Sequence, residues 1–162
     1  ERLWSPWRLA YVSGTGESQR CVFCDALTDN DPSGLVLFRG DACFVILNLY
    51  PYNNGHLMIV PFRHGGTLSS LTREELSELM VLTQRAEAAL TEAYCPQGLN
   101  VGLNLGRPAG AGIADHVHVH VVPRWTGDTN FMSVVGNVRV MPEELGETAR
   151  RLRPIFERLA RQ

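Results

Sequence analysis

The sequence contains no apolar run approaching the roughly eighteen residues of a membrane-spanning helix. Its first residues also lack the pattern of a signal peptide. Charge of either sign is not in excess, since 15 Lys and Arg face 17 Asp and Glu. The chain therefore has no overall positive electrostatic field that would favour a nucleic-acid or membrane partner. Four cysteines in 162 residues are too few for a disulfide scaffold, so a reducing cytoplasm is the expected location.

A single domain over residues 1–162 is the natural expectation for a chain of this length. Apolar runs bounded by turn residues predict five strands. They cover residues 35–38, 42–47, 55–61, 99–105 and 116–122. Short turns join the first three and the last two, so the sheet should be mainly antiparallel. One long helix separates the two groups and should cover one face, which makes the fold class α+β.

The long helix should begin after Thr72, which forms a capping box with Glu75. Apolar residues then recur at helical spacing to about Tyr94. Its charged residues, Glu78 among them, lie on other faces and are expected to be solvated.

Shorter helical segments are predicted at both ends of the chain. Residues 3–12 place two tryptophans around a Ser-Pro start, and a second segment opens at Pro142. Pro154 should kink or divide this second helix.

Three of the five histidines alternate with valines in the last predicted strand. Residues two apart on a strand project to the same face, so His116, His118 and His120 should form one row. The strand should end or become an edge at Pro123, which cannot donate to a sheet ladder. Because imidazole can act as nucleophile, proton shuttle or metal ligand, this row is the strongest functional signal in the chain.

A loop rich in glycine, residues 106–112, leads into the histidine strand. Such a loop can turn successive N–H groups toward an anion, and small residues let a phosphate approach closely. The position of the loop favours phosphate binding over a plain hairpin turn.

Cys21 and Cys24 form a Cys-x-x-Cys pair with three possible roles: a redox pair, half of a zinc site, or an incidental feature. The zinc role is favoured, because histidines are available as further ligands and no strand precedes the pair as a redox motif would require. Cys43 and Cys95 stand alone in apolar surroundings and are expected to be buried thiols.

The histidine row can carry out phosphoryl chemistry without a metal. If a backbone carbonyl holds Nδ1–H, the imidazole presents Nε2 as a nucleophile, and phosphorus is a natural target beside an anion-binding loop. His118, flanked by the other two, is the best candidate to attack. His120 would then contact the phosphoryl group or protonate the bridging oxygen.

These motifs resemble the histidine-triad (HIT) superfamily of nucleotide hydrolases and transferases. The resemblance rests on the His-Val-His-Val-His-Val-Val run, the glycine loop and the Gly-His-strand-Pro segment 55–61, and it covers a core of about 21–125. The flanks 3–8 and 123–131 look like the bacterial branch that includes diadenosine tetraphosphate phosphorylases. The fold implied is HIT-like, with helical extensions at both ends of the core.

The resemblance implies a role for each matching residue. His118 matches the nucleophile and His120 the histidine at the α-phosphate. The other implied substrate contacts are Asn48 at the ribose hydroxyls, Asn104 near the phosphates, and Val22 and Phe23 in the base pocket. A structural zinc is implied at Cys21, Cys24, His64 and His116.

One stretch departs from the family pattern. Gly112 and Ile113 stand where many members carry Gln-Ser or Gln-Thr before the triplet, so a side-chain contact to phosphate is missing. Backbone N–H groups of the loop would have to replace it. The candidates for phosphate binding are Gly110, Ala111, Gly112 and Ile113.

The expected function is a nucleotidyl transferase that cleaves dinucleoside polyphosphates, with phosphorolysis of diadenosine tetraphosphate to ADP and ATP through a nucleotidyl-His118 intermediate. Inorganic phosphate is then a second substrate, whereas water as acceptor would give a hydrolase. The alternatives are a nucleoside phosphoramidate hydrolase and a nucleotide-binding module without catalysis. The resemblance also implies a homodimer with a continuous sheet, which the long helix and the fourth strand could form, and a higher homo-oligomer is the alternative.

Overall fold

The computed structural model describes residues 21–28, 34–128 and 143–161. The predicted helix over residues 3–12 lies outside these ranges. So does the residue, Pro142, at which the C-terminal helix was expected to open.

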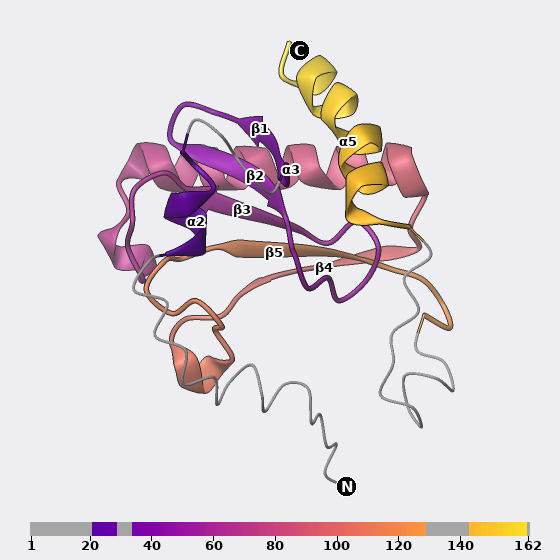
Figure 1. The fold of residues 1–162 in the computed structure, drawn as a ribbon. Coiled ribbons are helices and arrows are strands. Elements are labelled where there is room, and N and C mark those ends of the chain that lie inside the picture. The colour runs from indigo at the N-terminus through magenta and orange to yellow at the C-terminus, as the bar shows by residue number, and fades with distance from the viewer. Residues whose placement is uncertain (1–20, 29–33, 129–142, 162) are drawn as a thin grey trace, which may run out of the picture.

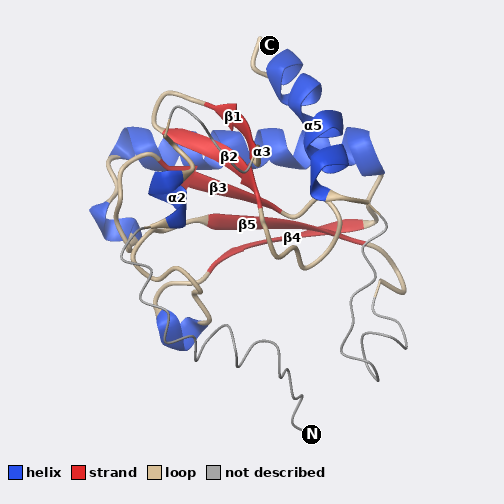
Figure 2. Cartoon of the chain, viewed as in Figure 1, coloured by secondary structure: helices blue, strands red, loops and turns tan. Residues whose placement is uncertain are grey.

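A five-stranded antiparallel sheet forms the centre of the molecule (Figures 1 and 2). Its strands stand in the order β1-β2-β3-β5-β4. In chain order they are β1 (Val36–Arg39), β2 (Cys43–Leu47), β3 (Leu57–Pro61), β4 (Gly98–Leu103) and β5 (Val119–Arg124). The predicted α+β class with five antiparallel strands is confirmed.

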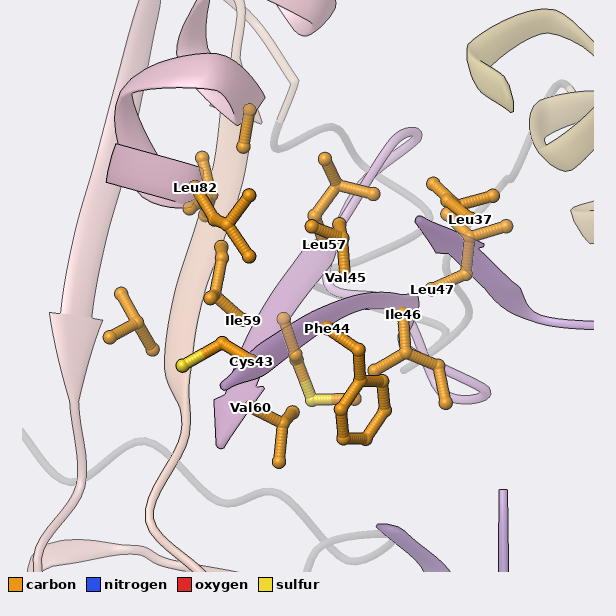
Figure 3. Packing of buried hydrophobic residues seen from close by; sticks show 14 of the residues in the cluster. Leu37, Cys43, Phe44, Val45, Ile46, Leu47, Leu57, Ile59, Val60 and Leu82 are labelled. Atoms are coloured by element: carbon orange, nitrogen blue, oxygen red, sulfur yellow. The ribbon is translucent and has the colours of Figure 1, made fainter. Parts of the chain in front are cut away.

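One face of the sheet is covered by the long helix α3 (Arg73–Tyr94) (Figure 1). The predicted capping box is present: Glu75 N–H donates to Thr72 Oγ1 at 3.2 Å, and Thr72 N–H donates to Glu75 Oε2 at 2.8 Å. Leu82 of α3 packs onto the apolar side chains of β2 and β3, as Figure 3 shows. Part of the core therefore lies between α3 and the sheet, and β2 and β3, which are buried at every residue, are covered on both faces.

The C-terminal helix α5 (Leu145–Leu159) packs on α3 and β1. Pro154 lies inside it, yet the helix is continuous, so the expected division is not observed. Proline removes one helical hydrogen bond, while the buried Leu152 and Phe156 on either side of it bind the helix to the core.

Two other expectations need correction. Cys95 is exposed, because it is the left-handed residue (φ 46°) that ends α3 and does not belong to the helix face packed on the sheet. Glu78 does more than face solvent: its carboxylate accepts hydrogen bonds from the backbone N–H groups of residues 41, 42 and 43, at 2.9, 2.5 and 2.7 Å. It thereby fixes the β1–β2 turn on α3.

The histidine strand begins later than predicted. Regular pairing in β5 starts at Val119, so His116 and His118 lie in the segment that leads into the strand. Pro123 does not end the strand, since it pairs with Leu99 of β4. Pairing with β3, however, stops at Val121, so Pro123 does lie at an edge on that side.

Three short helical turns complete the described part: α2 (Val22–Asp25), η1 (Leu68–Ser70) and η2 (Arg107–Ala109). Among the helices that the structure describes, none combines the length and apolar character needed to cross a membrane.

Candidate active site and metal site

The three histidines lie together at the start of β5. His116 and His118 are buried, and the rings of His118 and His120 meet edge to face with centroids 4.7 Å apart. The ring of Phe23 from α2 packs against His116 at 5.4 Å and His118 at 4.9 Å. Val119 packs into the core. Because successive residues of a strand point to opposite faces, His120 lies on the face of the sheet away from the Val119 side chain.

The protonation state of His118 follows from its backbone partner. Its Nδ1 lies 2.9 Å from the carbonyl oxygen of His116, which can only accept, so Nδ1 carries the proton. Burial lowers the pKa of His118, although this hydrogen bond opposes the shift. A neutral ring protonated on Nδ1 keeps a lone pair on Nε2, which is the form a nucleophilic histidine requires.

His56, immediately before β3, fixes the tautomer of His120. The backbone N–H of Tyr52 donates to His56 Nδ1 at 3.0 Å, and Asn48 Nδ2 lies 3.4 Å from the same nitrogen. His56 therefore carries its proton on Nε2, which donates to His120 Nδ1 at 2.9 Å. His120 in turn keeps its proton on Nε2.

The imidazole of His120 is uncharged in this arrangement. Burial, and then the neighbouring His118, lower the pKa of His120 to about 4. Near pH 7 its Nε2–H is thus a neutral hydrogen-bond donor without a transferable extra proton. This favours contact with a phosphoryl oxygen over protonation of the bridging oxygen.

The sequence did not predict a role for His56, although this residue lies in the Gly-His-strand-Pro segment. The missing information was the register of β3 against β5, in which Met58 pairs with His120. That pairing joins residues far apart in the chain, and the only local signal was the histidine itself.

Two cysteines and two histidines form a group that could hold a metal ion: the ligand atoms of Cys21, Cys24, His64 and His116 all lie within 4.8 Å of one another. Nδ1 of His116 is 3.3 Å from Sγ of Cys21, and Nδ1 of His64 is 3.5 Å from Sγ of Cys24. Ligands about 2.0–2.3 Å from a tetrahedral zinc stand at comparable separations.

The surroundings of this group also suit a cation. Nε2–H of His116 donates to the carbonyl oxygen of Pro61 at 2.8 Å, which leaves Nδ1 to face the cysteines. Such a second hydrogen bond orients metal-binding histidines. Burial, and then Cys21, raise the pKa of the Cys24 thiol, so two thiolates side by side need a positive charge between them.

The glycine loop is closed on itself. Gly106 and Gly110 adopt positive φ angles of 83° and 93°. Gly110 N–H donates to the carbonyl of Arg107 at 2.9 Å, and Ala111 N–H to that of Gly106 at 3.3 Å. Asn104 Nδ2 donates to the carbonyl of Gly110 at 3.4 Å, so this predicted phosphate contact also braces the loop.

Other predicted substrate residues take distinct positions. The side-chain Oδ1 of Asn48 accepts from Tyr50 N–H at 2.9 Å, beside His56. Val22 is exposed while Phe23 is buried against the histidine rings. Ile113, at the end of the loop, packs against the core. The roles of these residues toward a nucleotide stay predictions.

A HIT domain family model matches residues 30–127, and the chain belongs to that family. Among its relatives, an AP-4-A phosphorylase of Mycobacterium tuberculosis is 44% identical over 160 residues, covering 94% of this chain and 82% of that protein. A bis(5'-adenosyl)-triphosphatase of Dictyostelium discoideum is 28% identical over 128 residues, covering 75% and 85%. A Zn-bound histidine triad family protein from Mycobacterium smegmatis has a similar structure, with a TM-score of 0.70 at 29% identity, covering 89% of this chain and 98% of that one.

Proposed function

We propose that the protein is a nucleotidyl transferase that phosphorolyses diadenosine tetraphosphate to ADP and ATP. The chain is a HIT-type enzyme, as its named relatives are. The observation that carries the proposal is the tautomer of His118: a proton held on Nδ1 by the carbonyl of His116 and a lone pair on Nε2. The similarity to the mycobacterial phosphorylase supports the choice of substrate and acceptor.

The reaction has two displacements at one phosphorus. Nε2 of His118 forms a bond to an α-phosphorus as the bond from that phosphorus to its bridging oxygen breaks, and ATP leaves with the electron pair. An oxygen of inorganic phosphate then bonds to the phosphorus of the AMP moiety. The phosphorus–nitrogen bond breaks, ADP leaves, and the lone pair returns to Nε2.

The neighbours of His118 have supporting roles in this proposal. Nε2–H of His120 donates to a non-bridging oxygen, where negative charge grows in the transition state. Gly112 and Ile113 present backbone N–H groups to the phosphates, since those of Gly110 and Ala111 donate within the loop, and Asn48 holds the ribose. A zinc ion on Cys21, Cys24, His64 and His116 is structural, because it would use all four ligands and leave no open position.

Product analysis tests the proposed reaction. The purified protein is incubated with diadenosine tetraphosphate, with and without inorganic phosphate, and the nucleotides are separated by chromatography. We expect equal amounts of ADP and ATP, formed only with phosphate. AMP and ATP in both samples would instead identify a hydrolase, and nucleotide binding without any product would identify a binding module.

We also propose that two copies pair through β4 and the adjoining face of α3. β4 is at the edge of the sheet, and its Val101 and Leu103 are 51% and 36% exposed. On α3, Met80 is 60% exposed and shares a helical face with Glu87, which lines a groove against β4. An unpaired apolar edge strand is a surface that a second copy can cover.

Val101→Glu is expected to dissociate this dimer, because each copy would bury an unpaired carboxylate at the interface. The dimer dissociation constant should rise by about 100-fold or more, measured by sedimentation equilibrium. The isosteric Val101→Thr should retain most of the association. A wild-type protein that sediments as a monomer at micromolar concentration contradicts the proposal.

A further inference from the structure

The segment from Pro123 to Asp128 was prominent in the sequence but takes no part in the reaction described above. Its Asp128 side chain is only 12% exposed. The carboxylate accepts from Arg124 Nε at 2.6 Å and Nη2 at 2.9 Å, and from the backbone N–H of Trp125 at 3.3 Å. A further donor, Nδ2 of Asn53 at 2.9 Å, comes from the loop between β2 and β3. Asp128 thus joins the end of β5 to that loop.

Hydrogen bonds of Asn53 link the end of β5 to the backbone of His56. Its Nδ2 also donates to the carbonyl of Pro123 at 3.1 Å, and its Oδ1 accepts from Asn54 N–H at 3.2 Å. The backbone carbonyl of Asn53 accepts from His56 N–H at 3.2 Å. The side chain of Asn53 is therefore fixed to β5 while its backbone closes the turn that carries His56.

The same turn sets the orientation of the His56 ring. Tyr52 N–H, one residue before Asn53, donates to His56 Nδ1. The Tyr52 ring lies 4.7 Å from the His56 ring and 6.0 Å from the His120 ring, centroid to centroid. A displaced turn would move the Tyr52 N–H from Nδ1 and weaken the preference of the His56 proton for Nε2, because Asn48 Nδ2, which also faces Nδ1, is farther away at 3.4 Å.

We propose that Asp128 is a positioning residue, which acts through Asn53 to hold the turn Tyr52–His56 in the shape that keeps the proton of His120 on Nε2. The connection runs from Asp128 to Asn53, to the backbone and ring of His56, and to His120 Nδ1. Its kinetic consequence rests on the proposed function, in which His120 donates to the phosphoryl group. Its consequence for the tautomer of His120 does not depend on the proposed function.

The test compares Asn53→Ala and Asp128→Ala with a matched control, Asn100→Ala. Asn100 accepts from Arg124 Nη1 at 2.9 Å, so it belongs to the same network but lies off the path to His56. Proton-detected ¹⁵N spectra of histidine-labelled protein report which ring nitrogen of His120 is protonated. Steady-state kinetics with diadenosine tetraphosphate and phosphate report kcat and KM.

In Asn53→Ala and Asp128→Ala we expect His120 to populate both neutral tautomers. kcat should fall about tenfold, the effect of one well-placed hydrogen bond, with KM within about twofold. Asn100→Ala should resemble the wild type in both measurements. If Asp128→Ala does not fold, Asn53→Ala, which leaves the Asp128–Arg124 ion pair intact, still decides the matter.

An unchanged His120 tautomer in a folded Asn53→Ala variant overturns the proposal, even if thermal stability falls, because the connection would then be only structural. A changed tautomer in a protein whose wild type lacks turnover supports the positioning role while rejecting the proposed function.

Discussion

Replacing His118 with alanine is expected to reduce the turnover of diadenosine tetraphosphate by at least about 10³-fold, because the nucleophile of the first displacement is lost. The rate is measured as ATP formation at saturating substrate and phosphate. The effect should be mainly in kcat, since loop backbone and ribose contacts, rather than His118, would bind the ground state. In wild type quenched during turnover without phosphate, label from the α-phosphorus should remain on the protein in an acid-labile, base-stable linkage.

The variant should remain folded, which keeps this result interpretable. His118 is not among the four side chains of the metal group, so metal content and the far-ultraviolet circular dichroism spectrum should match those of the wild type. A folded variant with an undiminished rate, or a wild type that never acquires label on His118, would rule out the covalent route.

The second large effect concerns the proposed zinc ion. Cys24→Ser is expected to lower the metal content from about one zinc per chain to nearly none, because zinc binds thiolate in preference to a hydroxyl. Losing a structural zinc should cost several kcal/mol and lower the thermal midpoint by about 10 °C or more. Metal content is measured by plasma emission, and the midpoint by calorimetry.

Cys95→Ser is the matched control, because Cys95 is a free, exposed thiol at the end of α3 and outside the metal group. It should keep both the zinc and the thermal midpoint of the wild type. A wild-type protein purified without chelators that holds no metal, and whose midpoint does not change in Cys24→Ser, contradicts the assignment.

Local sequence patterns predicted much of this structure because they report local forces. Alternation and helical spacing located the strands and α3, and the capping box placed the start of α3 at Arg73. The patterns were less informative at Val119, where β5 begins, since the His-Val alternation continues on both sides of that boundary. Strand pairing, which is a contact between distant segments, determines where the regular strand begins.

Contacts between distant segments also explain what the sequence did not predict. The bond from His56 to His120 joins residues 64 positions apart, and that from Asn53 to Asp128 joins residues 75 positions apart. Glu78 looked like one charge among others on α3 until the β1–β2 turn was seen to bring three N–H groups to it. In each case the residue type permitted the contact, but only the packing of distant segments against one another selected it.

β3 contacts the histidine row at both of its ends. The residue before β3, His56, sets the proton on His120, and the last residue of β3, Pro61, supplies the carbonyl that turns His116 toward the cysteines. With Met58 opposite His120, both contacts share one alignment of β3 and β5. Inserting or deleting a single residue within β3 would therefore disturb the imidazoles of His116 and His120 together, so neither can be repositioned independently of the other.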